Sequence, residues 1–139
     1  MPRFLALDVG DSTIGVAVSD PLGITAQGVT TLRRGKFADD MNRLREFMQE
    51  YETEHFVIGL PRNMDGSQGK RCEVTHTFAT ALTEAIPTAK IIFWDERLST
   101  VAAENVLKAA GMRWRKRRKV VDKMAAVVIL QGFLDSHSE

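Results

Sequence analysis

The segment FLALDVGDSTIGVAVSD, at residues 4–20, limits most strongly what this chain can fold into. Two apolar runs flank the sequence VGDST, a pattern that predicts two strands joined by a tight turn. The first run leads to a carboxylate, Asp8, at the place where a buried strand emerges. Because an unpaired buried charge is costly, we expect Asp8 to have a partner. That partner is a basic side chain, a set of backbone N–H groups in the turn, or a bound cation.

The hydrophobic pattern of the whole chain predicts further strands and several helices. The apolar runs HFVIGL and KIIFW are typical of parallel strands that are buried on both faces. Helical spacing covers 37–51, where its apolar residues are Phe37, Met41, Leu44, Phe47, Met48 and Tyr51. We expect strands at 3–8, 13–19, 24–32, 55–60 and 90–94, and helices at 37–51, 72–85, 101–110 and 120–135. This order predicts a mixed α/β sheet with helices packed on it.

The composition is that of a soluble globular domain. Hydrophobic residues make up 44% and charged residues 27% of the 139 residues, and we expect a single domain, 1–139. No apolar run approaches the roughly 20 residues that a membrane-spanning helix needs, so we expect no membrane association. The single cysteine, Cys72, excludes an internal disulfide. Cysteine poverty suits a reducing compartment, and we expect a cytoplasmic protein.

A basic segment, RWRKRRK at residues 113–119, carries much of the positive charge. Without its six basic residues, 13 lysines and arginines would face 18 acidic residues. Such a concentrated segment predicts contacts with backbone phosphates, and an aromatic residue within it can stack on an unpaired base. The alternative is a solvated helix end with the tryptophan packed on the domain. The predicted substrate-binding residues here are Trp114, Arg115, Lys116, Arg117, Arg118 and Lys119.

Three acidic residues, Asp8, Glu96 and Asp122, are candidate ligands for a metal ion. Each also has a simpler explanation: Asp8 as a turn or capping residue, Glu96 as a partner of Arg97, and Asp122 as a first-turn acid favoured by the helix dipole. Together they supply the oxygen ligands that Mg²⁺ or Mn²⁺ prefers, and two such ions support in-line phosphoryl displacement. The adjacent acid Asp95 is an alternative ligand that spacing alone does not separate from Glu96.

The loop GLPRNMDGSQGKR, at residues 59–71, is the second candidate binding segment. Its glycines allow close approach of the backbone, and amide groups before a helix can hold a phosphate. The alternative is an ordinary turn built on the DG dipeptide. The predicted substrate-binding residues of this loop are Arg62, Asn63, Lys70 and Arg71.

Other catalytic arrangements have little support. His55, His76 and His137 lack ligand spacing and are expected to be surface or packing residues, and Cys72 is expected to fill a helix. Actin- and hexokinase-like phosphotransferases also begin with an Asp–x–Gly turn. They need a second domain and a further phosphate-binding turn, which 139 residues do not supply.

Four segments resemble the YqgF family, bacterial ribonuclease H-like nucleases related to RuvC-type Holliday junction resolvases. They are LALDVGDSTIGVAVSD, VIGLPRNMDGS, FWDERLSTVAAE and RKRRKVVDKMAAVVILQGFLDS, in order through essentially the whole chain. The resemblance implies a ribonuclease H-like five-stranded sheet, with an antiparallel meander, parallel strands and helices on both faces. It also implies metal-dependent phosphodiester cleavage by Asp8, Glu96 and Asp122. Where the family commonly has basic residues after the first turn, this chain has Ser12 and Thr13.

The leading hypothesis is a metal-dependent nuclease with a two-ion Mg²⁺ or Mn²⁺ site. The resemblance implies action on RNA or single-stranded nucleic acid, in 5′-end maturation of pre-16S rRNA. The alternatives are a resolvase of branched DNA and a non-catalytic nucleic-acid-binding protein. Symmetric resolution of a four-way junction needs two active sites and hence a dimer. Since no obvious dimer helix stands out, we expect a monomer or a weak dimer.

Overall fold

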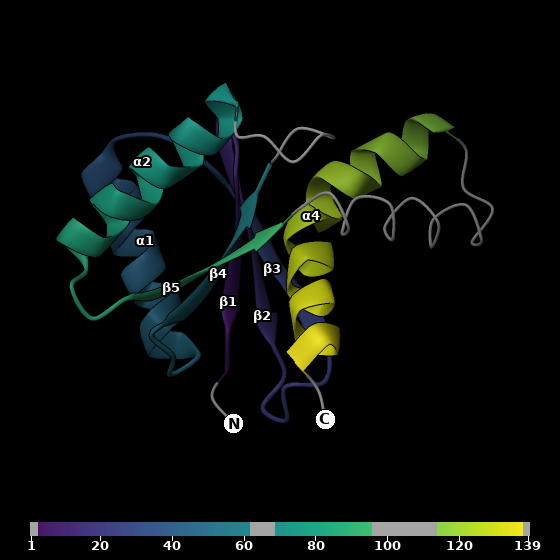
Figure 1. Ribbon diagram of the computed structural model, residues 1–139, viewed down its shortest axis with the longest axis horizontal. Helices are drawn as coiled ribbons and strands as arrows, with labels where there is room; N and C mark the ends of the chain where they lie inside the picture. Colours follow the sequence, from purple (N-terminus) through teal and green to yellow (C-terminus); the bar gives the residue numbers. More distant parts are fainter. Residues whose placement is uncertain (1–2, 62–68, 96–113, 138–139) are drawn as a thin grey trace.

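A five-stranded mixed sheet forms the centre of the protein, as a computed structural model shows (Figure 1). The structure describes residues 3–61, 69–95 and 114–137, and for 114–123 it describes the backbone alone. Strands β1 to β3 form an antiparallel meander, and β4 and β5 continue the sheet parallel to β1. The strands, in the spatial order β3-β2-β1-β4-β5, are β1 (Leu5–Val9), β2 (Thr13–Ser19), β3 (Ala26–Arg33), β4 (His55–Leu60) and β5 (Lys90–Asp95).

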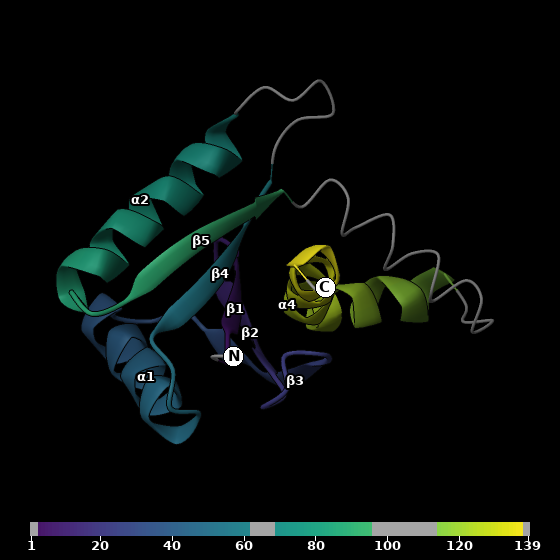
Figure 2. The same ribbon diagram turned by 60° about the horizontal axis from the view of Figure 1, so that its bottom comes forward.

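Helices cover both faces of this sheet (Figures 1 and 2). Helices α1 (Phe37–Glu50) and α2 (Lys70–Ala85) lie on one face, and α4 (Trp114–His137) lies on the other. The predicted fold class, with its meander, parallel strands and two covered faces, is confirmed. The helix predicted at 101–110 lies outside the described residues. None of the helices in the described part of the chain is long and apolar enough to cross a membrane.

The alternation of side chains along β1 explains why both faces are covered. Leu5, Leu7 and Val9 point into the core under α1 and α2, whereas Ala6 points into the core under α4. Both leucines are fully buried, and burying such a side chain stabilises the fold by roughly 1.5–3 kcal/mol. Because side chains alternate between faces, Asp8 is the next residue after Ala6 on the α4 face.

Small residues in the sheet let α4 approach it closely. A Cβ atom built at Gly28 would lie 3.5 Å from the Cγ2 atom of Val127, and the side chains of Ala6 and Ala17 are fully buried under the helix. Larger apolar side chains of α4 complete this core: Ile129, Leu130, Phe133 and Leu134.

The last helix begins six residues earlier than predicted, at Trp114 instead of Val120. The predicted boundary was wrong because arginine and lysine are good helix formers, so a basic run continues a helix as readily as it precedes one. Asp122 is therefore in the third turn of α4. The explanation of Asp122 as a first-turn acid stabilised by the helix dipole is contradicted, since that effect falls off within the first turn.

One further boundary and the burial of one residue also differ from the prediction. Helix α2 begins at Lys70 instead of Cys72, which places Lys70 and Arg71 in the helix rather than in the preceding loop. Phe37, expected on the apolar face of α1, is 41% exposed, although Met41 and Leu44 are buried as predicted. Phe37 is the first residue of the helix, so no earlier helical turn covers it, and helical spacing alone overestimates its burial.

The side-chain amide of Gln131 fixes α4 against the meander. Its Oε1 atom accepts a 2.9 Å hydrogen bond from the Ala26 N–H, and its Nε2 donates one of 2.9 Å to the Ile24 carbonyl. The amide thus pairs with the chain entering β3 as a neighbouring strand would, through one acceptor and one donor. This pairing sets the position of the helix along the sheet.

We expect Gln131→Ala to destabilise the protein by about 1–2 kcal/mol, because two backbone hydrogen bonds lose their partner. The midpoint of urea unfolding measures this change. Gln131→Glu keeps the acceptor but brings a carboxylate against the Ile24 carbonyl and the Asp135 carboxylate, so its loss should be at least as large. Equal stability of all three proteins would contradict the bracing role of this side chain.

Candidate active site

Asp8 lies at the carboxyl end of β1 on the face covered by α4. It pairs with Gly15 of β2, and a Cβ atom built at Gly15 would lie 3.5 Å from the Asp8 Cβ and 3.6 Å from the Ala126 Cβ. Asp8 is therefore partly buried, beside the position in β2 where Gly15 has no side chain and beside the middle of α4. Carboxyl ends of strands are where open α/β sheets bind their ligands.

The structure tests the three partners expected for Asp8. Within the described part of the chain, the Asp8 side chain has no salt bridge and no hydrogen bond to a backbone N–H. The N–H of Gly10, in the adjoining turn, donates instead to the Thr13 carbonyl over 2.8 Å. A partly buried carboxylate with these contacts fits the donor set of a hard divalent cation.

Helix α4 brings a second predicted ligand toward this position. The rings of Phe133 and Phe4 are 5.0 Å apart, and Ala126 lies beside Asp8, so α4 runs antiparallel to β1. Asp122 precedes Ala126 by four residues. Its backbone is therefore about one helical turn closer to the start of α4 than that of Ala126, toward the carboxyl end of β1. The structure describes the backbone of Asp122 and not its side chain.

The register of the parallel strands separates Asp95 from Asp8. Trp94 pairs with Gly59 and packs in the core under α4, on the same face as Asp8. By alternation, Asp95 belongs to the opposite face, which α1 and α2 cover. Glu96 follows immediately in the sequence and lies outside the described residues. Among the side chains that the structure describes, no group of three His, Cys, Asp or Glu residues can hold a metal ion.

The structure describes two of the four residues that were predicted to bind substrate in the 59–71 loop. Lys70 and Arg71 are the first two residues of α2 and are exposed, whereas Arg62 and Asn63 lie outside the described residues. The Arg71 Nη1 atom is 3.0 Å from the Asp11 Oδ2 atom, so the start of α2 lies next to the β1–β2 turn. Two cations at a helix N-terminus oppose the helix dipole, and here Asp11 and the first-turn acid Glu73 offset part of their charge.

The basic run forms the first turns of α4. The first six residues of the helix are Trp114, Arg115, Lys116, Arg117, Arg118 and Lys119. The structure describes their backbone and not their side chains. Figure 1 shows this first part of the helix, in green, leading away from the sheet, while the second part, in yellow, lies along it. The backbone thus extends the run outward beyond the position of Asp122.

The histidines and the cysteine have the packing roles expected for them. Each imidazole ring lies against a phenylalanine ring, with centroids between 4.2 and 5.5 Å apart. Cys72 is fully buried in α2.

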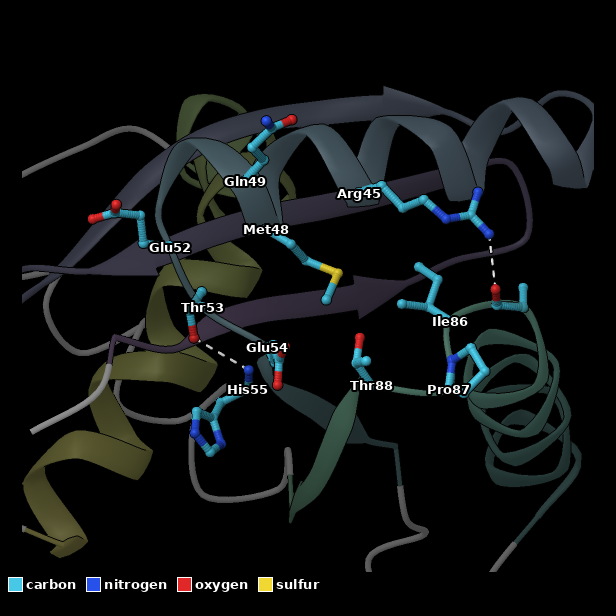
Figure 3. Close-up of a pocket in the computed structure, with 11 residues that line it drawn as sticks. Arg45, Met48, Gln49, Glu52, Thr53, Glu54, His55, Ile86, Pro87 and Thr88 are labelled. Atoms are coloured by element: carbon cyan, nitrogen blue, oxygen red, sulfur yellow. Dashed lines mark hydrogen bonds between the residues drawn. The ribbon is translucent and has the colours of Figure 1, made fainter.

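A cavity of about 700 Å³ lies at the other end of the sheet (Figure 3). It is bordered by the end of α1, the start of β4 and the segment after α2, where Arg45 donates a 2.8 Å hydrogen bond to the Ala85 carbonyl. This cavity is at the amino ends of the parallel strands, since it includes His55, the first residue of β4. It is therefore remote from Asp8.

Gly15 was not among the residues predicted from the sequence, although the sequence holds a signal for it. A glycine inside an apolar strand often marks a place where another group approaches closely. Here the approaching groups are the Asp8 side chain and α4.

Solved structures with the same arrangement of strands and helices define the fold class. The chain superimposes on "T. thermophilus RuvC in complex with Holliday junction substrate" with a TM-score of 0.60 and 12% identity, covering 98% of this chain and 95% of that one. A fowlpox virus resolvase, solved with Holliday junction DNA, gives a TM-score of 0.52 at 9% identity and covers 99% of each chain. The fold is that of the ribonuclease H-like proteins.

The family is shown by the sequence itself. The profile described as "RuvX: Holliday junction resolvase" matches residues 2–136, and the chain belongs to this family. A relative from Desulforamulus reducens is 53% identical over 96% of this chain and 97% of its own length. One from Clostridium botulinum is 50% identical over 99% of both. Both carry the name "Putative pre-16S rRNA nuclease", and the resemblance to the YqgF family is confirmed.

We expect Gly15→Ala to fold normally, since its methyl group would make ordinary van der Waals contacts with Asp8 and Ala126. Gly15→Leu should cost roughly 1–3 kcal/mol, because the larger side chain must displace α4 or the Asp8 side chain. Urea unfolding measures both. Gly35→Leu is the matched control, because no atom lies within 4 Å of a Cβ built there. Equal losses in the two leucine variants would contradict the close packing at Gly15.

Proposed function

We propose that this protein is a metal-dependent nuclease that hydrolyses phosphodiester bonds of RNA or single-stranded nucleic acid. The observation that carries the proposal is the position of Asp8. It is a partly buried carboxylate at the carboxyl end of a central strand, without a salt bridge in the described part of the chain. Membership of the RuvX family supports a nuclease rather than a non-catalytic binding protein.

Asp8, Glu96 and Asp122 are the residues proposed to hold one or two Mg²⁺ or Mn²⁺ ions. Such ions, when bound, activate a water molecule and stabilise charge on the departing oxygen of the phosphodiester. The structure supports the position of Asp8 directly and that of Asp122 through its backbone. Gly15 and Ala126 leave room for the Asp8 carboxylate on the α4 face. Asp95 belongs to the face of the sheet opposite to Asp8, which favours Glu96 over Asp95 as the third proposed metal ligand.

Cations on two elements are proposed to hold the substrate backbone. Lys70 and Arg71 form a positive group at the start of α2, beside the β1–β2 turn. Arginine and lysine at a helix N-terminus reduce the stability of the helix, so a phosphate that binds there would relieve the repulsion. The basic run 114–119 extends from α4 on the other side of Asp122. Substrate would then lie between these groups, across the carboxyl end of the sheet.

The proposed physiological substrate is the precursor of 16S rRNA, because the relatives carry the name "Putative pre-16S rRNA nuclease". A four-way DNA junction is the second candidate, favoured by the description of the family. Symmetric cleavage of a junction requires two active sites in a two-fold assembly. The two candidates therefore differ in the assembly that they require as well as in the substrate.

Asp8→Asn should lower cleavage more than roughly 100-fold, since removing even a group that only orients metal ligands costs 10–100-fold. Cleavage of RNA, single-stranded DNA and four-way junctions is measured with Mg²⁺ and with Mn²⁺. Glu50→Gln, at the end of α1 remote from the site, is the matched control and should keep full activity. Full activity of Asp8→Asn would overturn the proposal.

Reversal of two charges in the basic run, Arg117→Glu with Arg118→Glu, should weaken binding of single-stranded RNA. Each phosphate contact that is lost should reduce the slope of log K against log salt by about 0.7. Titrations at several salt concentrations measure this slope. Arg43→Glu, an exposed position on α1, is the control and should leave the slope unchanged. A slope unchanged in the double variant would exclude the run from the interface.

A further inference from the structure

A cavity of about 430 Å³ lies near the carboxyl end of the sheet, on the face away from α4. It opens between the start of α1 and the first half of α2, the two helices that cover this face (Figure 2). Its volume is within the range of small-ligand pockets. The lining residues are Arg34, Phe37, Glu73, Val74, Thr77, Phe78 and Ala81.

Two large apolar side chains are exposed at this cavity. Phe37, the first residue of α1, is 41% exposed, and Val74 of α2 is 40% exposed. Solvent-facing apolar groups that gather at one concave place mark an interaction site more often than scattered ones do. An aromatic ring in this setting offers a flat face on which another ring can stack.

Two cationic residues, Arg34 in the lining and Lys36 beside Phe37, lie near the apolar groups. The Arg34 guanidinium lies 5.4 Å from the centroid of the Phe78 ring and donates a 2.8 Å hydrogen bond from Nη1 to the Gly10 carbonyl. The guanidinium carries five N–H groups, so others remain for a ligand. Lys36, the residue before Phe37, is exposed and forms no salt bridge within the described residues. Arg33 belongs to the opposite face of the sheet, because Leu32 before it packs in the core under α1 and α2.

The acid in the lining indicates which part of a nucleotide fits. Glu73 would repel a phosphate inside the cavity, whereas the amino groups of a nucleobase can donate hydrogen bonds to it. The phosphates on either side of the base would instead lie outside, near Lys36. The arrangement of charges thus suits a base inside the cavity and a backbone at its rim.

The cavity is connected to the candidate active site through the β1–β2 turn. Arg34 contacts Gly10, two residues after Asp8, and the Arg34 N–H donates to the Ser12 carbonyl over 2.8 Å. Asp8 and the cavity therefore lie on opposite faces of the same end of the sheet. We propose that this cavity binds an unpaired nucleobase of the substrate strand, with Phe37 as the stacking partner. This inference rests on the proposed nuclease function and adds a preference for single strands.

The experiment compares binding of labelled single-stranded RNA and DNA by fluorescence anisotropy, in EDTA so that no cleavage occurs. Phe37→Ala should weaken binding roughly tenfold, near the lower end of the range for base–aromatic stacking. Phe37→Trp should retain the affinity. Leu22→Ala, which removes a 72% exposed apolar side chain from the β2–β3 turn, is the matched control and should bind as the unmodified protein does.

Two further probes identify the bound group. Oligonucleotides that carry abasic sites should bind the unmodified protein more weakly, and Phe37→Ala should reduce this difference. Duplex RNA and DNA should be bound equally by Phe37→Ala and the unmodified protein, because paired bases are held within the stack. A loss that is equal for single strands and duplexes would overturn the inference.

The outcomes separate this inference from the nuclease proposal. If Phe37→Ala binds single strands as tightly as Leu22→Ala, the cavity is not a base site, and the nuclease proposal is unaffected. If the unmodified protein binds no nucleic acid in EDTA, the base site is overturned, and if it also cleaves none with Mg²⁺ or Mn²⁺, the nuclease proposal is overturned as well. Val74→Gln, which makes the opposite wall polar, should weaken binding in the same direction as Phe37→Ala. No change in the Val74→Gln variant would also count against the cavity.

Discussion

The placement of one carboxylate inside an apolar framework is the constraint on which the rest of this structure depends. Asp8 is the fourth residue of β1, a strand that is buried on both faces, and it lies partly buried on the face covered by α4. A charged group in such a place is stable only where compensation is available. In the described part of the chain the protein offers Asp8 neither a cation nor a backbone donor. A partly buried carboxylate at the carboxyl end of a central strand is what makes this end of the sheet chemically distinctive.

The surroundings of Asp8 are arranged by close packing. Gly15 has no side chain and Ala126 has only a methyl group, so β2 and α4 approach each other closely beside Asp8. Gln131 fixes the position of α4 along the meander. A helix held in this way carries Asp122 to a defined backbone position, about one turn beyond Ala126. Packing and chemistry are thus joined in α4, because the helix that completes one core also carries a candidate ligand.

The β1–β2 turn connects two surfaces that lie on opposite faces of the sheet. Its Gly10 carbonyl accepts a hydrogen bond from Arg34, and its Asp11 pairs with Arg71 at the start of α2. A strand of nucleic acid that crosses this turn would meet a carboxylate on one side and cationic and aromatic side chains on the other. The solved resolvases share the fold at low identity, so they establish the framework and not these surface groups.

The sequence by itself determined where the strands and most of the helices lie and that Asp8 is near a strand end, because periodicity and turn residues act locally. The five-stranded sheet with helices on both faces was implied by the resemblance to the YqgF family, and the structure confirmed it. The sequence did not determine where α4 begins or that Phe37 is exposed, since helix formers fit several boundaries and burial depends on the neighbouring elements. Tertiary structure alone decided that Asp95 faces away from Asp8 and that Gly15 lies between Asp8 and Ala126. Those relations arise from the register between strands and from the seating of a helix, which residues distant in the chain fix together.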